Sequence, residues 1–293
     1  MKVAISANPA KSVALAAARR AFERLEGKAE VEWSEETARA LGVTDPGRPV
    51  EEFTAEALVG FGGDGTFLTL LKRTAIPLLP VNAGTVGFLA EIDADKPAAL
   101  DDALVRLVEH RYFVEDRMKL ACTVAGAALP DATNEVVVHT SQVAKMRVFE
   151  IAIDGEAVGQ LRADGLILST PTGSTSYSLS ALGPVIEPTV EAIVVTALAP
   201  FQATQRAVVI DPLRTVSVRL VHPEKDGVVV IDGQSETKIA AGESVTVYRS
   251  SRPASFVRFG AQFYRRLLGR GILPWAAGGA EPFGADPDVS PST

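Results

Sequence analysis

Short apolar runs alternate with segments of helical periodicity over the first ~115 residues of the chain. Residues 3–6 form the first run, and residues 11–26 then carry apolar side chains at helical spacing. The same pattern predicts further strands at residues 31–33, 58–61 and 77–82, and helices at 67–73 and from Pro97 onward. Alternation of this kind is typical of an α/β domain with a mainly parallel sheet and helices on both faces.

Beyond residue ~115 the apolar period changes from helical to two residues. Asp154-Gly155 and Asp232-Gly233 lie between such runs and are typical hairpin turns. We therefore predict an α/β domain over 1–115, an all-β sandwich over 116–259, and a disordered Gly- and Pro-rich tail at 276–293. The predicted strands of the sandwich lie at residues 136–138, 149–153, 166–168, 193–195, 208–210, 216–218, 228–231 and 245–247.

Composition narrows the classes of function. The 293 residues include 36 acidic and 29 basic side chains, and the net charge of −7 argues against nucleic acid as a partner. No apolar stretch approaches the ~18–20 residues of a membrane span, so no membrane partner is expected. The single cysteine, Cys122, excludes an intrachain disulfide and indicates a cytoplasmic protein. Its alternating apolar surroundings favour a buried hydrophobic role over a nucleophilic one.

A glycine-rich loop follows the strand predicted at 58–61. It consists of Gly62, Gly63, Asp64, Gly65 and Thr66, and a helical segment comes next. Glycines at the start of a helix let backbone amides approach an anion, so this loop is a candidate phosphate cradle. Its carboxylate would repel phosphate, which suggests a general base or a magnesium ligand instead. A tight turn with positive backbone φ angles is the alternative. The Walker A pattern, in which Gly-Lys-Ser/Thr ends the glycine loop, is absent.

Three further segments carry candidate ligand-binding groups. Residues 82–89 repeat the glycine pattern after the next strand, and both loops should line one crevice at the carboxyl ends of the strands. Asn134-Glu135 suits ribose hydroxyls, although a simple strand-entry turn fits the local pattern as well. Residues 169–180 contain eight Ser or Thr residues and Tyr177, typical of a ligand-binding loop; a solvated linker is the alternative.

Histidine chemistry has no support in the chain. His110, His139 and His222 are the only histidines, and none has metal-ligand spacing to another His or Cys. The G-x-S-x-G pattern of serine hydrolases is absent too. These observations argue against zinc-dependent and histidine-dependent mechanisms.

In their order and spacing, these segments resemble the NAD kinase family from about residue 2 to about residue 268. The most specific part is the string Asp-Gly-x5-Pro-Thr-Gly-Ser-Thr-x-Tyr that begins at Asp164. The resemblance implies a Rossmann-like N-terminal domain and a β-sandwich that holds NAD against it. A final segment, residues 260–275, would complete the first domain. It also implies magnesium-dependent transfer of the ATP γ-phosphoryl group to the 2′-hydroxyl of the adenosine ribose of NAD, an EC 2.7.1.23 reaction.

The resemblance also implies roles for particular residues. Asp64 would be the catalytic base, the phosphate loop would comprise Gly62, Gly63, Gly65 and Thr66, and no metal ligand is assigned. Lys145 would contact a nucleotide phosphate, and Ala199 the nicotinamide side. The remaining contacts to NAD would come from Asp64, Gly65, Asn134, Glu135, Arg162, Asp164, Thr175, Ser176, Tyr177, Ser178, Leu179, Ser180 and Gln234. The chain departs from the family at Phe201, where histidine is common, and at Leu182, where glycine is common.

Two other functions share parts of this pattern. A lipid kinase of the diacylglycerol or sphingosine type has a similar glycine loop, but the hydroxyl-rich string and the acidic charge do not suggest one. A non-catalytic NAD or NADP sensor would bind the dinucleotide without forming NADP. We expect a cytoplasmic homodimer or homotetramer. The sequence does not choose between ATP and polyphosphate, between NAD and NADH, or between dimer and tetramer.

Overall fold

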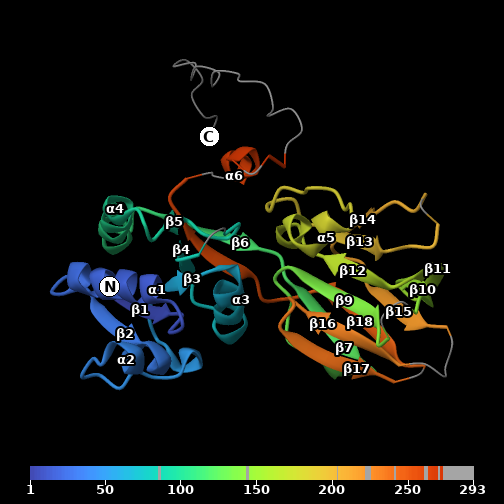
Figure 1. Ribbon diagram of the computed structural model, residues 1–293, viewed down its shortest axis with the longest axis horizontal. Helices are drawn as coiled ribbons and strands as arrows, with labels where there is room; N and C mark the ends of the chain where they lie inside the picture. Colours follow the sequence, from blue (N-terminus) through green and yellow to red (C-terminus); the bar gives the residue numbers. More distant parts are fainter. Residues whose placement is uncertain are drawn as a thin grey trace, which may run out of the picture. The chain divides into compact units, whose positions relative to one another are not determined.

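The computed structural model describes residues 1–84, 87–142, 145–202, 204–221, 226–240, 242–260, 263–269 and 271–272. They divide into two compact units, residues 1–259 and a C-terminal unit that begins at Gly260. The first unit contains one mainly parallel sheet covered by helices, and two antiparallel sheets (Figure 1). The tail predicted at 276–293 lies outside the described residues.

The first sheet has the strand order β2-β1-β3-β4-β19-β6, with the short β5 paired to β4. All of its pairs are parallel except β19 with β6. The predicted mainly parallel sheet is thus confirmed. Its strands are β1 Lys2–Ala7, β2 Glu30–Trp33, β3 Ala57–Gly62, β4 Leu78–Asn82, β5 Ile92–Asp93, β6 Phe113–Arg117 and β19 Ala254–Arg258.

Helices cover both faces of this sheet because its strands are apolar on both sides. Along β1, Val3 and Ile5 belong to one core and Ala4 to the other. The first core takes side chains from α1, α2 and α4, and the second from α3 and η1 (Figure 1). These helices are α1 Ser12–Leu25, α2 Glu35–Leu41, η1 Val50–Glu52, α3 Asp64–Arg73 and α4 Pro97–Val108. None of the helices described is long and apolar enough to cross a membrane.

Two six-stranded sheets form the predicted β-sandwich, with orders β11-β10-β15-β18-β7-β8 and β14-β13-β12-β9-β16-β17. Alternate residues of both sheets, such as Phe149 and Leu168, fill one continuous core. The strands are β7 Leu120–Val124, β8 Ala127–Ala128, β9 Glu135–Thr140, β10 Arg147–Ile153, β11 Glu156–Ala163, β12 Gly165–Ser169, β13 Ile193–Leu198, β14 Val208–Ile210, β15 Val216–Leu220, β16 Gly227–Ile231, β17 Ser235–Ile239 and β18 Ser244–Arg249.

Both predicted hairpin turns form. Asp154 and Gly155 connect β10 to β11, and Asp232 and Gly233 connect β16 to β17. All four residues have positive φ, as a two-residue hairpin with the right twist requires. The hydroxyl-rich string after β12 folds into two short helices, η2 Thr172–Thr175 and α5 Tyr177–Ser180.

The chain returns to the first sheet after the sandwich. Strand β19, drawn in orange in Figure 1, pairs with both β4 and β6. In the C-terminal unit, residues 263–269 form helix α6 Phe263–Gly269. The domain limits at 115 and 259, and the role of residues 260–275 in the first domain, stay predictions.

Candidate active site

Asp64 is the first residue of α3, at the carboxyl end of β3. Its carboxylate accepts hydrogen bonds from the backbone amides of Phe88, at 2.7 Å, and Leu89, at 3.2 Å. The loop after β4 therefore meets the glycine loop, as expected for the ends of neighbouring parallel strands. These two bonds fix the orientation of the Asp64 carboxylate.

A buried ion pair anchors the loop that holds Asp64. Arg258 on β19 donates to the carbonyl oxygen of Leu89 at 3.0 Å and pairs with Glu91, also at 3.0 Å. Both charged side chains are almost completely buried. Charge-assisted bonds in a buried setting are strong and directional, so this pair keeps the Phe88 and Leu89 amides in place.

The glycines of the phosphate loop do not form a tight turn with positive φ angles, because the φ angles of Gly62, Gly63 and Gly65 lie outside that region. Gly62 is needed for packing, since a Cβ there would lie 2.4 Å from the hydroxyl oxygen of Thr66. The nearest atom to a Cβ on Gly63 or Gly65 is 3.7 Å or more away. The missing Cβ atoms at these two positions let an anion approach the backbone amides at the start of α3, which is what a phosphate cradle needs.

Lys11, which no pattern in the sequence marks, lies between the two glycine loops. Its ammonium is 2.9 Å from the point where a Cβ on Gly84 would lie, and 3.7 Å from the same point on Gly63. No described carboxylate forms an ion pair with it. A cation beside the exposed amides of a helix start supplies the positive charge that a phosphate needs.

Asn134 and Glu135 lie at the start of β9, where one buried carboxylate orders the backbone. Asp232 accepts hydrogen bonds from the amides of Thr133, Asn134 and Glu135 at 3.1, 2.8 and 3.2 Å. Burial, reinforced by the Asp232 charge, raises the pKa of Glu135 to about 7. This pair is more than a strand-entry turn, because it is buried and structurally supported.

The string at 169–180 is not a solvated linker. Thr170 donates to the Thr133 carbonyl oxygen at 2.6 Å, and Ser176 donates to Glu135 at 3.4 Å. Tyr177 is 41% exposed, so its ring is accessible for stacking. Several buried polar atoms around this string have no hydrogen-bond partner among the described residues: Thr133 Oγ1, Glu135 Oε2, Ser169 Oγ and Thr172 Oγ1. Unpaired buried polar atoms are costly, which favours a ligand here.

The remaining predicted residues gather at the opposite end of β12. Glu135 pairs with Ser169 at one end of this strand, and Asp164 directly precedes Gly165 at the other end. At ~3.3 Å per residue, Gly165 and Ser169 lie ~13 Å apart. Asp164 donates its amide to the Leu198 carbonyl oxygen, and one oxygen of its carboxylate is buried without a described partner. The structure thus presents two groups of predicted residues. The first contains Asn134, Glu135 and Ser176, at the Ser169 end of β12. The second group contains Lys145, Arg162, Asp164 and Ala199.

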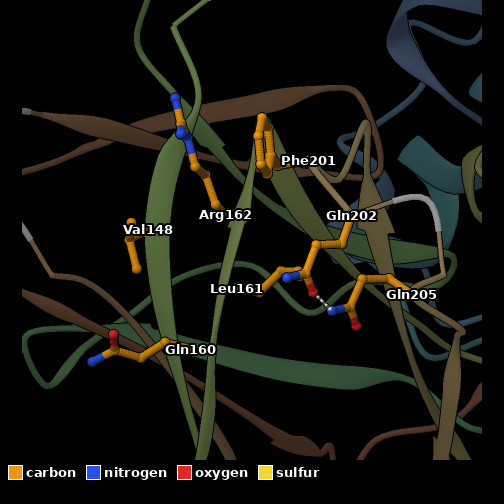
Figure 2. Close-up of a pocket in the computed structure, with 7 residues that line it drawn as sticks. All are labelled: Val148, Gln160, Leu161, Arg162, Phe201, Gln202 and Gln205. Carbon is orange, nitrogen blue, oxygen red and sulfur yellow. Dashed lines mark hydrogen bonds between the residues drawn. The ribbon is translucent and has the colours of Figure 1, made fainter.

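Arg162 faces a small pocket in this second group. Its guanidinium carbon lies 4.8 Å from the centre of the Phe201 ring. Figure 2 draws both side chains among the residues that line the pocket. The pocket, of about 210 Å³, is lined by Val148, Gln160, Leu161, Arg162, Phe201, Gln202 and Gln205. Phe201 stands where histidine is common in the family the sequence resembles. Here it supplies an aromatic face for Arg162.

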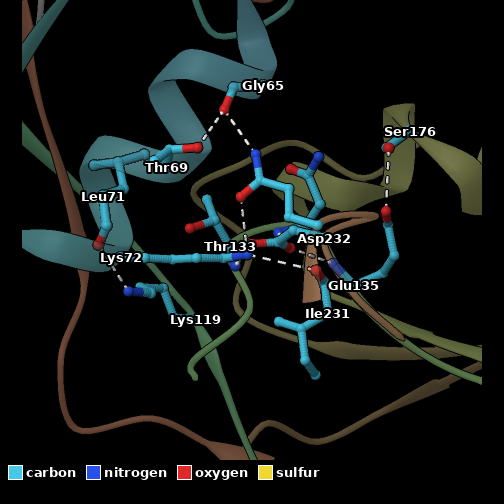
Figure 3. A network of polar contacts seen from close by, with 12 residues as sticks. Gly65, Thr69, Leu71, Lys72, Lys119, Thr133, Glu135, Ser176, Ile231 and Asp232 are labelled. Atoms are coloured by element: carbon cyan, nitrogen blue, oxygen red, sulfur yellow. Dashed lines mark hydrogen bonds and ion pairs between the residues drawn. The ribbon is translucent and has the colours of Figure 1, made fainter. Parts of the chain in front are cut away.

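Gln234 connects the β16–β17 hairpin to helix α3. Its side-chain amide donates to the Gly65 carbonyl oxygen at 2.7 Å, and its side-chain oxygen accepts from Lys72 at 3.1 Å. Figure 3 shows the network around Lys72, which also includes Asp232. Because Gln234 lies just after the β16–β17 turn, it joins the phosphate loop to the sandwich.

Comparison with known families and proteins agrees with this geometry. Residues 10–112 match the model of the ATP-NAD kinase N-terminal domain, and residues 133–259 match that of the ATP-NAD kinase C-terminal domain. The NAD kinase of Thermoplasma volcanium is 38% identical over 232 residues, which cover 79% of this chain and 84% of that protein. The NAD kinase of Thermococcus kodakarensis is 37% identical over 270 residues, 90% and 96% of the two chains.

Solved structures show the same fold. An NAD kinase from Archaeoglobus fulgidus, solved in complex with ATP, has a TM-score of 0.73 and 28% identity, and the match covers 95% of this chain and all of that one. Yeast NADH kinase complexed with NADH has a TM-score of 0.81 at 22% identity, over 91% of this chain and 86% of that one, which is evidence for the fold alone. The two family matches together span most of the chain, and so the protein belongs to the ATP-NAD kinase family.

Proposed function

We propose that this chain transfers the γ-phosphoryl group of ATP to the 2′-hydroxyl of the adenosine ribose of NAD, forming NADP, with Asp64 as general base. Phosphorylation of NAD by a nucleoside triphosphate follows from the family, and its matches do not favour a lipid kinase or a non-catalytic sensor. The reaction is a phosphotransfer to an alcohol group. One observation carries the residue assignment: Asp64 is held by two amides at the helix start, beside Lys11, which forms no ion pair with a described carboxylate.

The chemistry follows from these positions. Asp64 takes the proton of the 2′-hydroxyl as that oxygen bonds to the γ-phosphorus, and ADP leaves with the electrons of the broken P–O bond. Glu135 and Asn134 hold the ribose, and Tyr177 offers a face for the adenine. Lys11 and the amides of Gly63 and Gly65 hold donor phosphates. The contacts of Arg162, Asp164, Lys145 and Ala199 to the rest of the dinucleotide are part of the same proposal.

Magnesium is proposed to enter with ATP. Among the described residues no group of three or more His, Cys, Asp or Glu side chains could hold a metal ion. This suits Mg²⁺, which in kinases is bound largely by phosphate oxygens and water, with one or two carboxylates. When bound, the ion neutralises charge that develops on the transferred phosphoryl group.

Replacement of Asp64 tests the assignment of the base. General base catalysis contributes ~10²–10⁴-fold, which is about 3–5 kcal/mol of the barrier. We therefore expect Asp64→Asn to lower kcat at least tenfold while NAD binding, measured by calorimetry, persists. Asp102→Asn, which removes an exposed carboxylate on α4, is the matched control. Near-normal turnover of the Asp64 variant would disprove the assignment. In the same assay, exchanging ATP for polyphosphate and NAD for NADH identifies the donor and acceptor.

Replacement of Lys11 tests the donor site. A charge-assisted hydrogen bond contributes ~1.5–3 kcal/mol, so Lys11→Met should raise the KM for ATP roughly 10-fold to 100-fold. The affinity for NAD should change less than twofold. Lys28→Met, at an exposed lysine beyond the end of α1, is the matched control. If the KM for ATP does not change, Lys11 is not a phosphate ligand.

We also propose a cytoplasmic homo-oligomer. The buried single cysteine fits a reducing compartment. Val208 and Val209 on the edge strand β14 are each 54% exposed, and apolar side chains on an unpaired edge favour association between chains.

A further inference from the structure

Lys72 lies in the last turn of α3 and reaches the β16–β17 turn of the sandwich. Its ammonium is 3.1 Å from the side-chain oxygen of Gln234, 3.4 Å from the carbonyl oxygen of Ile231 and 3.5 Å from the Asp232 carboxylate. The Lys72 side chain is only 12% exposed, and that of Asp232 is completely buried. All three acceptors belong to the same turn, so Lys72 binds this turn from one side (Figure 3).

The turn that Lys72 binds also sets the backbone of the ribose-binding residues. The Asp232 carboxylate accepts three consecutive amides, those of Thr133, Asn134 and Glu135. The amide of Asp232 in turn donates to the Glu135 carbonyl oxygen at 3.0 Å. Any shift of the turn therefore shifts the start of β9. Lys72 supplies a positive charge beside this buried carboxylate.

Helix α3 is attached to the sandwich at both of its ends. At the first turn, the Gly65 carbonyl oxygen accepts from Gln234. At the last turn, Lys72 binds the Asp232 turn, and the buried Lys119 donates to the Leu71 carbonyl oxygen at 3.0 Å. Seven positions separate Gly65 from Lys72, ~10 Å along a helix. An α-helix held at two points that far apart can neither slide nor tilt freely.

We propose that Lys72 is a positioning residue: by holding the end of α3 against the Asp232 turn, it sets the distance from Asp64 to Asn134 and Glu135. The proposal rests on the proposed function, in which Asp64 deprotonates a ribose hydroxyl that Asn134 and Glu135 hold. A proton transfer requires heavy atoms within ~2.6–3.2 Å, so a small displacement of α3 slows the chemical step. Binding of ATP, which uses other contacts, is affected less.

Replacement of Lys72 by methionine keeps much of the side-chain volume and removes the charge and the hydrogen bonds. We expect Lys72→Met to lower kcat at least tenfold while the KM for ATP changes less than threefold. Lys72→Arg keeps a charged donor and should recover most of kcat. The matched control is Arg73→Met, which removes the neighbouring cation of the same helical turn. Arg73 pairs with Glu51, outside the sandwich, and its loss should leave kcat within twofold.

Hydrogen exchange of the Thr133, Asn134 and Glu135 amides gives a second readout that does not depend on activity. These amides should exchange at least tenfold faster in Lys72→Met than in the wild type or Arg73→Met. The double variant Lys72→Gln/Asp232→Asn removes both charges, so it can fold without a buried unpaired carboxylate. Its kcat should still stay at least tenfold below that of the wild type, because the attachment is lost.

Two results would overturn the positioning role. One is a folded Lys72→Met protein with kcat within twofold of the wild type and unchanged amide exchange. The other is full recovery of kcat in the double variant, which would reduce the role of Lys72 to neutralising charge. If the wild type itself forms no NADP, the proposed function fails instead. The exchange measurement then still decides whether Lys72 orders the start of β9.

Discussion

Glu135 is the residue whose protonation the structure perturbs most clearly among the candidate ribose ligands. Desolvation raises its pKa to about 7, and the Asp232 charge beside it acts in the same direction. In the unfolded chain its pKa returns to about 4.5. Between these values the folded chain binds more protons than the unfolded chain. Stability from this group is therefore full below pH ~4.5 and is lost as the pH rises through about 7.

Replacement of Glu135 by glutamine should remove this part of the pH dependence. From pH 5.5 to pH 8, the free energy of unfolding should fall by about 2 kcal/mol more in the wild type than in Glu135→Gln. Urea unfolding at the two pH values measures it. Glu236→Gln, at an exposed carboxylate of the same sheet, should behave like the wild type. An equal pH dependence in Glu135→Gln and the wild type would show that Glu135 does not titrate as described.

Single residues differ in how far the sequence predicted their place. Cys122 lies in an alternating apolar run and is buried, with its pKa raised to about 12, as an unreactive core thiol should be. Asp64 could be proposed as the base from the sequence because glycines surround it. Lys11 and Lys72 could not, because a lone lysine has no pattern and their partners lie 52 or more positions away in the chain. The contacts on which their proposed roles rest form only when the chain folds.

At the scale of elements, the two-residue period predicted the sandwich well, because alternate residues of its strands fill one core. All eight predicted runs became strands. Strand β11 was missed because it is an exposed edge strand that contains Gly159, so it lacks an apolar face. Helix α2 was missed because only Thr37 and Ala38 are buried in it. The pairing of β19 with β4 and β6 joins distant segments, which no local pattern encodes.

The short helix η2 packs directly against the start of β9. A Cβ on Gly173 would lie 2.1 Å from the Asn134 carbonyl oxygen, so only glycine fits there without movement of the backbone. Overpacking of this kind costs ~1–3 kcal/mol. We expect Gly173→Ala to lower the stability by that amount and to raise the KM for NAD, because Asn134 and Glu135 must move.

Thermal unfolding and steady-state kinetics measure the two effects of Gly173→Ala. The control is Gly269→Ala in α6, where an added Cβ meets no atom within 4 Å. If Gly173→Ala neither raises the KM for NAD nor lowers the unfolding temperature, the contact between η2 and β9 does not shape the ribose site.

At the scale of the whole molecule, the number of chains in the proposed homo-oligomer can be measured directly. Light scattering behind a sizing column should give two or four times the mass of one chain. The double variant Val208→Lys/Val209→Lys should shift the measured mass toward that of one chain, because charge on an edge strand blocks pairing between sheets. A wild-type protein with the mass of a single chain would contradict the proposed oligomer. An unchanged mass in the double variant would exclude the β14 edge as the interface.

The strands that lead into and out of the sandwich lie next to each other, with Arg117 of β6 opposite Ala254 of β19. Opposed residues of an antiparallel pair are only ~4.5–5.5 Å apart, which a two-residue turn can span. Residues 118–253 therefore begin and end at almost the same point, as an inserted module does. Residues 118–253 could therefore be exchanged between relatives at the junction of β6 and β19, with the hydrogen bonds of the first sheet left intact.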